Sequence, residues 1–170
     1  IDQLSEDAKI IGAVNTVKLL ENGKTEGHNT DAFGFKQALG LKWNNHATRA
    51  LILGTGGASK AIEYVLGEME IETLFVSRNP KEGQIHYNDI NQDLINSHLL
   101  IINCTPLGTH PAVDQAPAIP FDLIHDKHFL FDLIYNPEVS LFLNEGFKRG
   151  ATIQNGYFML EQQAEKSWNI

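Results

Sequence analysis

The chain has 170 residues, of which 42% are hydrophobic and 20% charged, a composition typical of a folded domain and not of a disordered segment. The 21 acidic residues outnumber the 13 basic ones, giving a net charge of −8 that argues against nucleic acids and anionic membranes as partners. We find no apolar run of the ~20 residues that a membrane span needs, and no secretory leader pattern. The single cysteine, Cys104, excludes an internal disulfide and indicates a reducing compartment, so we expect a cytoplasmic protein. Cysteine and histidine are too scattered to predict a metal site.

The first thirty residues have the character of a piece of a larger unit. Residues 4–9 are interpreted as the end of a helix whose start lies outside the chain. Asn22-Gly23, between two extended runs, predicts a β-hairpin. Because a lone hairpin is only marginally stable in water, we expect it to join a larger sheet, and favour one completed by sequence outside this chain.

The rest of the chain alternates between predicted helices and strands. A helix capped by Thr30 or Asp31 is expected to run through Leu39 and to stop at Gly40. Buried strands are predicted at 50–53, 73–76, 99–102, 129–134 and 152–153, and helices at 58–66, 93–95, 139–149 and 157–168. Residues 110–120 predict a loop. Strands separated by helices indicate an α/β fold with a doubly wound parallel sheet.

A glycine-rich turn links the first buried strand directly to a helix. Gly54 permits the tight turn, and Gly56 lets the backbone approach a pyrophosphate. Backbone N–H groups and the helix dipole would then hold the phosphates. Ser59 stands where the third glycine of G-x-G-x-x-G belongs, so the pattern is imperfect. In this strand–turn–helix context the turn still predicts a dinucleotide site in a Rossmann-like fold.

The end of the second strand bears on which dinucleotide is bound. NAD enzymes usually carry an acidic residue here for the ribose 2′-hydroxyl, whereas this chain has Ser77, Arg78 and Asn79. A guanidinium can hold a 2′-phosphate through paired charge-assisted hydrogen bonds, which favours NADP. The alternative interpretation of Arg78 is a solvated surface side chain.

Polar residues elsewhere supply candidates for the chemistry. Thr105 follows the third strand and could line the nicotinamide or ribose. Cys104 has no visible base beside it, which favours a small buried cysteine over a nucleophile. Asp31 is open to two readings. It is either the N-cap of its helix, kept ionised by the helix dipole, or a carboxylate that binds a substrate hydroxyl and holds a proton donor.

Seven segments, in the same order, resemble those of the shikimate dehydrogenase family. They are GAVNT (12–16), GHNTDAFG (27–34), GTGGASKA (54–61), SRN (77–79), NCTPLG (103–108), DLIYNP (132–137) and GYFMLEQQA (156–164). The resemblance implies a remnant of a substrate-binding domain at 1–30, an NADP-binding Rossmann-like domain at 31–155, and a helix at 156–170 that returns to the substrate domain.

The resemblance also implies an activity, the NADP-dependent interconversion of 3-dehydroshikimate and shikimate in chorismate and aromatic amino-acid synthesis. It implies a small-molecule substrate bound by Asn15, Asp31, Tyr135 and Gln163, with Asp31 also half of a catalytic Lys–Asp pair. The cofactor contacts it implies are Gly54, Gly56, Gly57, Ala58, Ser77, Arg78, Asn79, Thr105 and Gly156.

The departures from the family pattern matter for activity. The family's catalytic lysine has no counterpart here, because the chain begins just before the GAVNT segment. Ser77 and Asn79 replace the family's usual Asn and Thr on either side of the arginine. We therefore expect the chain to bind NADP but to turn over poorly alone. Two alternatives are a quinate/shikimate dehydrogenase using NAD, and a noncatalytic nucleotide-binding module.

Overall fold

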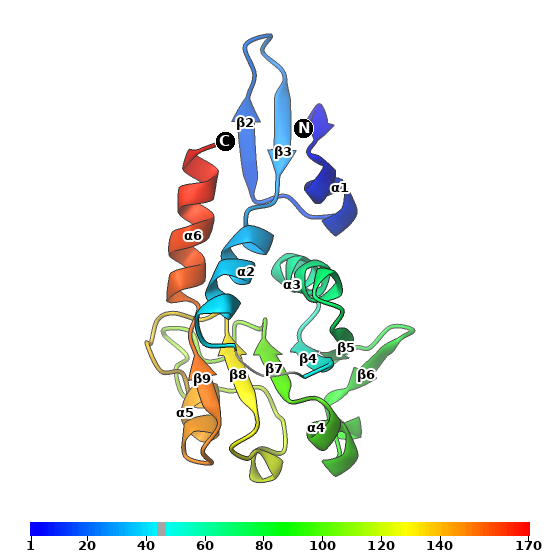
Figure 1. Ribbon diagram of the computed structural model, residues 1–170, viewed down its shortest axis with the longest axis vertical. Coiled ribbons are helices and arrows are strands. Elements are labelled where there is room, and N and C mark those ends of the chain that lie inside the picture. The colour runs from blue at the N-terminus through cyan, green and yellow to red at the C-terminus, as the bar shows by residue number, and fades with distance from the viewer. Residues whose placement is uncertain (44–46) are drawn as a thin grey trace.

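The computed structural model describes residues 1–43 and 47–170, which form two β-sheets joined by helices (Figure 1). The small sheet has the order β1-β3-β2 and consists of β1 (Gln3–Leu4), β2 (Thr16–Leu19) and β3 (Thr25–His28). The large sheet has the order β6-β5-β4-β7-β8-β9. Its strands are β4 (Arg49–Leu53), β5 (Glu72–Ser77), β6 (Gln84–His86), β7 (Leu100–Asn103), β8 (Phe129–Asp132) and β9 (Thr152–Gln154).

The large sheet confirms the predicted fold class. All its neighbouring strands pair in parallel, and the chain runs outward from β4 to one edge and then from β7 to the other. This order is that of a doubly wound, Rossmann-like sheet. The five predicted strands are all present, and β6 is an additional edge strand. Its sequence, Gln-Ile-His, is too short and too polar to have been identified as a buried strand.

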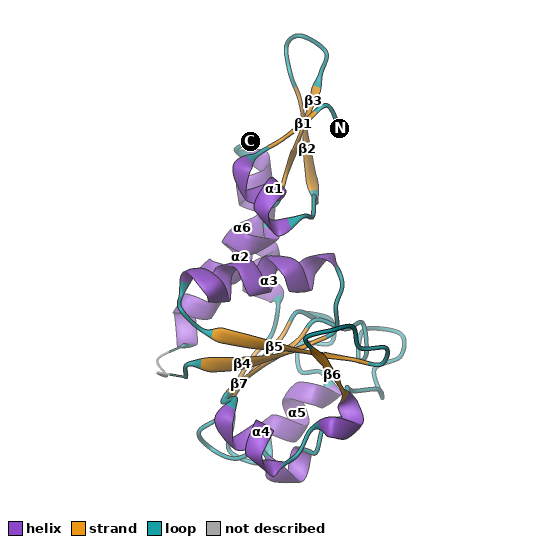
Figure 2. Cartoon of the chain, turned by 90° about the vertical axis from the view of Figure 1, so that its right-hand side faces the viewer, coloured by secondary structure: helices purple, strands orange, loops and turns teal. Residues whose placement is uncertain are grey.

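Helices cover both faces of the large sheet (Figure 2). One face carries α2 (Asp31–Lys42), α3 (Gly57–Glu68) and α6 (Tyr157–Trp168), and the other carries α4 (Gln92–Ser97) and α5 (Leu141–Phe147). Two 3₁₀ turns, η1 (Tyr87–Asp89) and η2 (Phe121–Leu123), follow β6 and the 110–120 loop. Because side chains alternate along a strand, Ile52 packs with Phe35 in one core, whereas Leu51 packs with Phe142 in the other.

Helix α6 connects the large sheet to the small one. It packs closely along α2, where a Cβ atom added to Gly34 would lie 2.6 Å from the Met159 carbonyl oxygen. At its far end the Ser167 hydroxyl lies 2.8 Å from the Thr16 hydroxyl of β2. The α2–α6 pair thus links the two sheets (Figure 1), and a second connection joins α3 to α1 (Glu6–Ile11), where Tyr64 Oη lies 3.4 Å from Asp7 Oδ1.

Two predictions for the helices near the N-terminus are wrong. Residues 4–9 do not end a helix: Ser5 begins one, α1 (Glu6–Ile11), because its hydroxyl accepts a hydrogen bond from the Ala8 amide. Gly40 does not stop α2, which continues to Lys42 because the next residue, Trp43, packs on Phe129 in the core with ring centroids 5.2 Å apart.

The predicted hairpin is confirmed. Strands β2 and β3 pair in antiparallel fashion on either side of Asn22-Gly23, and Gly23 adopts the left-handed conformation. This chain supplies a further strand, β1, which pairs in parallel with β3. Within residues 1–43 and 47–170, no helix has the length and apolar character that a membrane span requires.

Candidate active site

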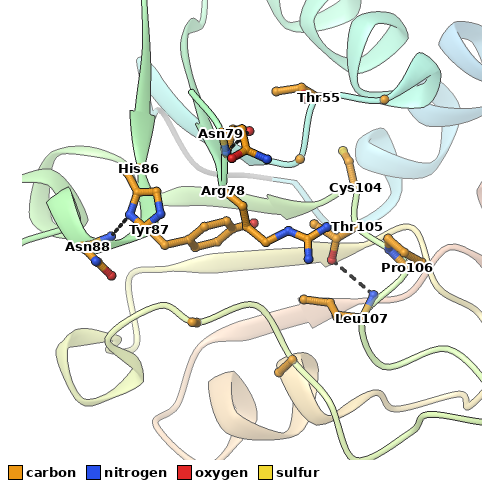
Figure 3. A pocket seen from close by; sticks show the side chains of 15 residues that line it. Thr55, Arg78, Asn79, His86, Tyr87, Asn88, Cys104, Thr105, Pro106 and Leu107 are labelled. Carbon is orange, nitrogen blue, oxygen red and sulfur yellow. Dashed lines mark hydrogen bonds between the residues drawn. The ribbon is translucent and has the colours of Figure 1, made fainter. Parts of the chain in front are cut away.

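A cavity of about 600 Å³ lies at the carboxyl ends of β4, β5, β6 and β7 (Figure 3). In a doubly wound sheet this edge is where ligands bind. Six of the predicted cofactor residues line the cavity: Gly54, Gly56, Ser77, Arg78, Asn79 and Thr105. The other lining residues are Thr55, His86, Tyr87, Asn88, Cys104, Pro106, Leu107, Ala116 and Ala118.

The glycine turn leaves the start of α3 open to this cavity. Gly54 has a φ of 101°, and a Cβ atom there would lie 3.1 Å from the Thr105 methyl group, so the position favours glycine. Gly56 is the N-cap of α3, with no side-chain cap and no acidic residue in the first turn. Ser59, in place of the third glycine, is buried and donates its hydroxyl proton to the Gly56 carbonyl at 2.6 Å. The first-turn N–H groups are thus free of side-chain acceptors, which suits a phosphate.

Arg78 supplies a positive charge to the same cavity. Its side chain extends into the cavity beside the ring of Tyr87 (Figure 3), and it forms no ion pair with any described residue. Burial raises the pKa of the Tyr87 phenol, and the nearby Arg78 charge partly opposes this shift. None of the described lining residues is acidic. This donor set fits a dinucleotide that carries an additional phosphate on the adenosine side.

The segment after β7 forms another wall of the cavity. Thr105 donates its amide and hydroxyl protons to Asn103 Oδ1, at 2.9 and 2.7 Å, and its hydroxyl oxygen accepts from the Leu107 amide at 3.3 Å. Burial, reinforced by the Asp132 charge, raises the pKa of the Cys104 thiol far above its ordinary value. Because only the thiolate is an effective nucleophile, this supports a packing role for Cys104.

Three predicted substrate residues from distant parts of the sequence meet in one polar cluster beside α2. Asn15 Nδ2 donates to Asp31 Oδ1 at 2.8 Å, while Asn15 Oδ1 accepts from the Thr30 amide at 2.9 Å. The Thr30 hydroxyl in turn lies 3.3 Å from Gln163 Oε1 on α6. The cluster is outside the cavity lining, but Ala13, two residues before Asn15, lies against Gly57 at the start of α3.

Asp31 is not the N-cap of its helix, which was one of the two interpretations that the sequence left open. It is the first residue of α2, and Thr30, the other predicted cap, is the N-cap; one first-turn amide, that of Ala32, donates to Asn29 Oδ1 at 3.2 Å. Burial raises the pKa of the Asp31 carboxyl, although the hydrogen bond from Asn15 opposes the shift. Oδ2 has no partner among the described residues and is available to a ligand.

Four predicted site residues lie apart from these groups. Tyr135, after β8, is 48% exposed and contacts neither the cavity nor the polar cluster. Gly156 precedes α6, where an added Cβ atom would collide with the Leu133 carbonyl oxygen. Gly57 and Ala58 form the first turn of α3 behind the lining. No group of three His, Cys, Asp or Glu side chains in the described part of the chain is placed to hold a metal ion.

The wall formed by His86, Tyr87 and Asn88 was not predicted. It follows β6, whose last residue, His86, pairs with Ser77 at the end of β5. The only available sequence signal was the asparagine–aspartate pair at 88–89, which is typical of a turn after a strand.

Comparison with known proteins identifies relatives of this chain. It matches no protein-family model. It is 41% identical to a shikimate dehydrogenase (NADP(+)) of Methanococcus maripaludis strain C6 and 35% identical to one of Desulforamulus reducens. Both alignments cover all of this chain and 66% and 65% of the relatives, so the chain spans just under two thirds of their length.

Solved structures agree with the sequence comparison. The crystal structure of a shikimate dehydrogenase in complex with NADP+ has a TM-score of 0.86 at 29% identity, over 99% of this chain and 64% of that one. The Thermus thermophilus enzyme, solved with NADP(H) and shikimate, has a TM-score of 0.86 at 30% identity, over 99% and 66% of the two chains. Because the identity extends over the whole chain and the fold is shared, the chain belongs to the shikimate dehydrogenase family.

Proposed function

We propose that this protein is an NADP-dependent shikimate dehydrogenase, which interconverts 3-dehydroshikimate and shikimate in the synthesis of chorismate and aromatic amino acids. The observation that carries the proposal is the meeting of Asn15, Asp31 and Gln163 in one hydrogen-bonded cluster. Amide and carboxylate groups so placed suit a small substrate with several hydroxyls. The names of relatives up to 41% identical support the same activity.

The cavity is proposed to hold NADP. The amides of residues 54–57 and the start of α3 would bind the pyrophosphate, and Arg78 would bind the 2′-phosphate, with Ser77 and Asn79 beside it. Thr105 would line the nicotinamide end of the cavity, whereas Gly156, which the family resemblance implies as a further cofactor contact, lies outside the lining. When bound, the cofactor supplies the hydride acceptor or donor at its nicotinamide ring.

Asp31 is proposed to act on the substrate proton. Oxidation of an alcohol releases a proton from its hydroxyl, and a carboxylate with a free Oδ2 can accept that hydroxyl's hydrogen bond and hold a neighbouring proton donor. No lysine in the described part of the chain forms an ion pair with Asp31. We therefore infer that the 170-residue chain alone binds NADP but turns over slowly. We place the reaction in the cytoplasm, which suits a single free cysteine.

The proposal is tested by measuring shikimate-dependent NADP+ reduction in the full-length protein. Asp31→Asn should lower kcat by about 100-fold or more while leaving NADP+ binding intact, because general acid–base groups contribute factors of this size. Asp93→Asn, which alters an exposed carboxylate on α4 across the sheet, is the matched control and should have no effect.

Two results would contradict the proposal. Normal turnover by Asp31→Asn would show that the cluster does not take part in the chemistry, as expected of a noncatalytic nucleotide-binding module. Faster turnover of quinate with NAD+ than of shikimate with NADP+ would instead indicate a quinate/shikimate dehydrogenase that uses NAD.

A further inference from the structure

A buried carboxylate lies behind the cavity wall. Asp132, the last residue of β8, has no exposed surface. Its Oδ1 accepts hydrogen bonds from Asn103 Nδ2 and from the Ile134 amide, both at 3.0 Å, and its Oδ2 accepts one from the Ser140 hydroxyl. No cation among the described residues pairs with it. The charge is therefore held by neutral donors alone.

This arrangement is unfavourable for stability at neutral pH. Burial raises the pKa of Asp132 to about 6, which the hydrogen bonds from Ser140, Ile134 and Asn103 only partly offset. Above that pH the folded protein must keep an ionised carboxylate away from water, which an uncharged residue would avoid. Stability alone thus gives no reason for a carboxylate at this position.

The carboxylate does fix the orientation of its neighbour. Asn103 is fully buried, and its amide could in principle point either way. An ionised carboxylate only accepts hydrogen bonds, so Asn103 must direct Nδ2 toward Asp132 and Oδ1 toward Thr105. Asn103 Oδ1 then receives both the amide and the hydroxyl protons of Thr105.

Thr105 connects the oriented Asn103 to the cavity wall. With both its donors committed to Asn103, its methyl group is held against Gly54, where an added Cβ atom would lie 3.1 Å away. The wall after β7 and the glycine turn after β4 are thereby held in one fixed relation. A ligand lying between them meets a preformed surface.

We propose that Asp132 is a positioning residue that acts through Asn103 to fix Thr105 against Gly54, and so shapes the wall against which the dinucleotide binds. The inference rests on the proposed function, because the dinucleotide is taken to be NADP. Asp132 itself does not line the cavity, so it would act without contacting the ligand.

The test measures NADP+ affinity and unfolding of the chain carrying Asp132→Asn. The isosteric amide can no longer enforce the orientation of Asn103, so we expect NADP+ to bind about fivefold more weakly, the factor that corresponds to one hydrogen bond. The unfolding midpoint at neutral pH should not fall, because a buried charge has been removed. Gln154→Leu is the matched control: it alters a buried amide on the adjacent strand β9 and should leave NADP+ affinity unchanged. Unchanged affinity in Asp132→Asn would overturn the inference.

A double-mutant cycle tests whether the effect passes through Thr105. Thr105→Val removes the hydroxyl but keeps the methyl group, and should weaken NADP+ binding more than Thr105→Ser, which keeps the bond to Asn103. Adding Asp132→Asn to Thr105→Val should cost less than Asp132→Asn alone, whereas fully additive losses would overturn the relay.

The remaining outcomes are also decisive. If Asp132→Asn fails to fold, the NADP+ affinities of Thr105→Val and Thr105→Ser decide. Equal affinities of these two variants overturn the inference. A wild-type chain that does not bind NADP+ would overturn the proposed function and this inference together. A wild-type chain that binds NADP+ while its variants bind equally well would overturn the inference alone.

Discussion

Replacement of Arg78 by alanine tests how the protein distinguishes NADP from NAD. The side chain reaches into the cavity, is exposed and pairs with no described residue, so its removal should not disturb the fold. Charge-assisted hydrogen bonds to a phosphate contribute about 1.5–3 kcal/mol each, and solvent exposure reduces the sum of a bidentate pair. We take the net loss as about 2 kcal/mol, which is about a 30-fold weaker affinity for NADP+.

The assay is a titration of the wild-type and Arg78→Ala chains with NADP+ and with NAD+. NAD+ lacks the 2′-phosphate, so its affinity should change by no more than about twofold. Lys81→Ala is the matched control, because Lys81 is an exposed cation three residues further along that does not line the cavity. Raising the salt concentration should narrow the difference between wild type and Arg78→Ala. Equal losses for both cofactors, or an equal loss in Lys81→Ala, would refute the assignment of Arg78 to the 2′-phosphate.

Further predictions concern stability and pH. The pKa of Asp132 is about 6 in the folded protein against an ordinary value of 3.8, so its stabilising contribution is complete below pH 3.8 and is lost as the pH rises through 6, by roughly 3 kcal/mol. Urea unfolding compared between pH 3.8 and a pH above 6 should show this loss in wild type and not in Asp132→Asn. Gly34→Ala should destabilise the fold by about 1–3 kcal/mol, because its Cβ atom would lie 2.6 Å from the Met159 carbonyl oxygen. Gly40→Ala in the same helix has open space around it and should stabilise the fold by up to about 1 kcal/mol. Thermal unfolding measures both changes. The pKa of Asp31 is raised, so the pH profile of kcat/KM for shikimate should fall on its acidic side with an apparent pKa above the ordinary value for aspartate. An apparent pKa at or below that value would contradict the role of Asp31 as the ionised acceptor.

The cofactor half of the site was largely predictable from sequence because its determinants are local. A buried strand, a glycine that must adopt positive φ and a helix start follow one another within ten residues, and Arg78 stands at the end of the next strand. The carboxyl ends of parallel strands share one edge of a sheet, so placing the strands also places these residues together. His86 and its neighbours were missed because β6 is an edge strand with no apolar run.

The grouping of Asn15, Asp31 and Gln163 in one cluster was suggested only by the family resemblance. Nothing in the local pattern connects Asn15 with Gln163, which are separated by most of the chain and meet only because α6 packs back along α2. The same limit applies to the raised pKa of Asp31. Its position at the start of a helix is visible in the sequence, whereas its burial beneath Asn15 is a consequence of tertiary structure.

The helix pair α2 and α6 sets how the two halves of the site stand relative to each other. In the proposed reaction, hydride transfer would require the substrate carbon and the nicotinamide ring to approach within a narrow range of distance, so the polar cluster would have to be held at a fixed offset from the cavity. The cluster is attached to the first turn of α2 and to α6, and these helices approach so closely at Gly34 that no side chain fits between them. A Cβ atom at Gly34 would lie 3.0 Å from Gln163 Cβ and 2.6 Å from the Met159 carbonyl oxygen, so it would displace Gln163 relative to Asp31. We expect Gly34→Ala to lower turnover of the full-length protein more than it lowers NADP+ affinity, because no residue of α2 or α6 lines the cavity.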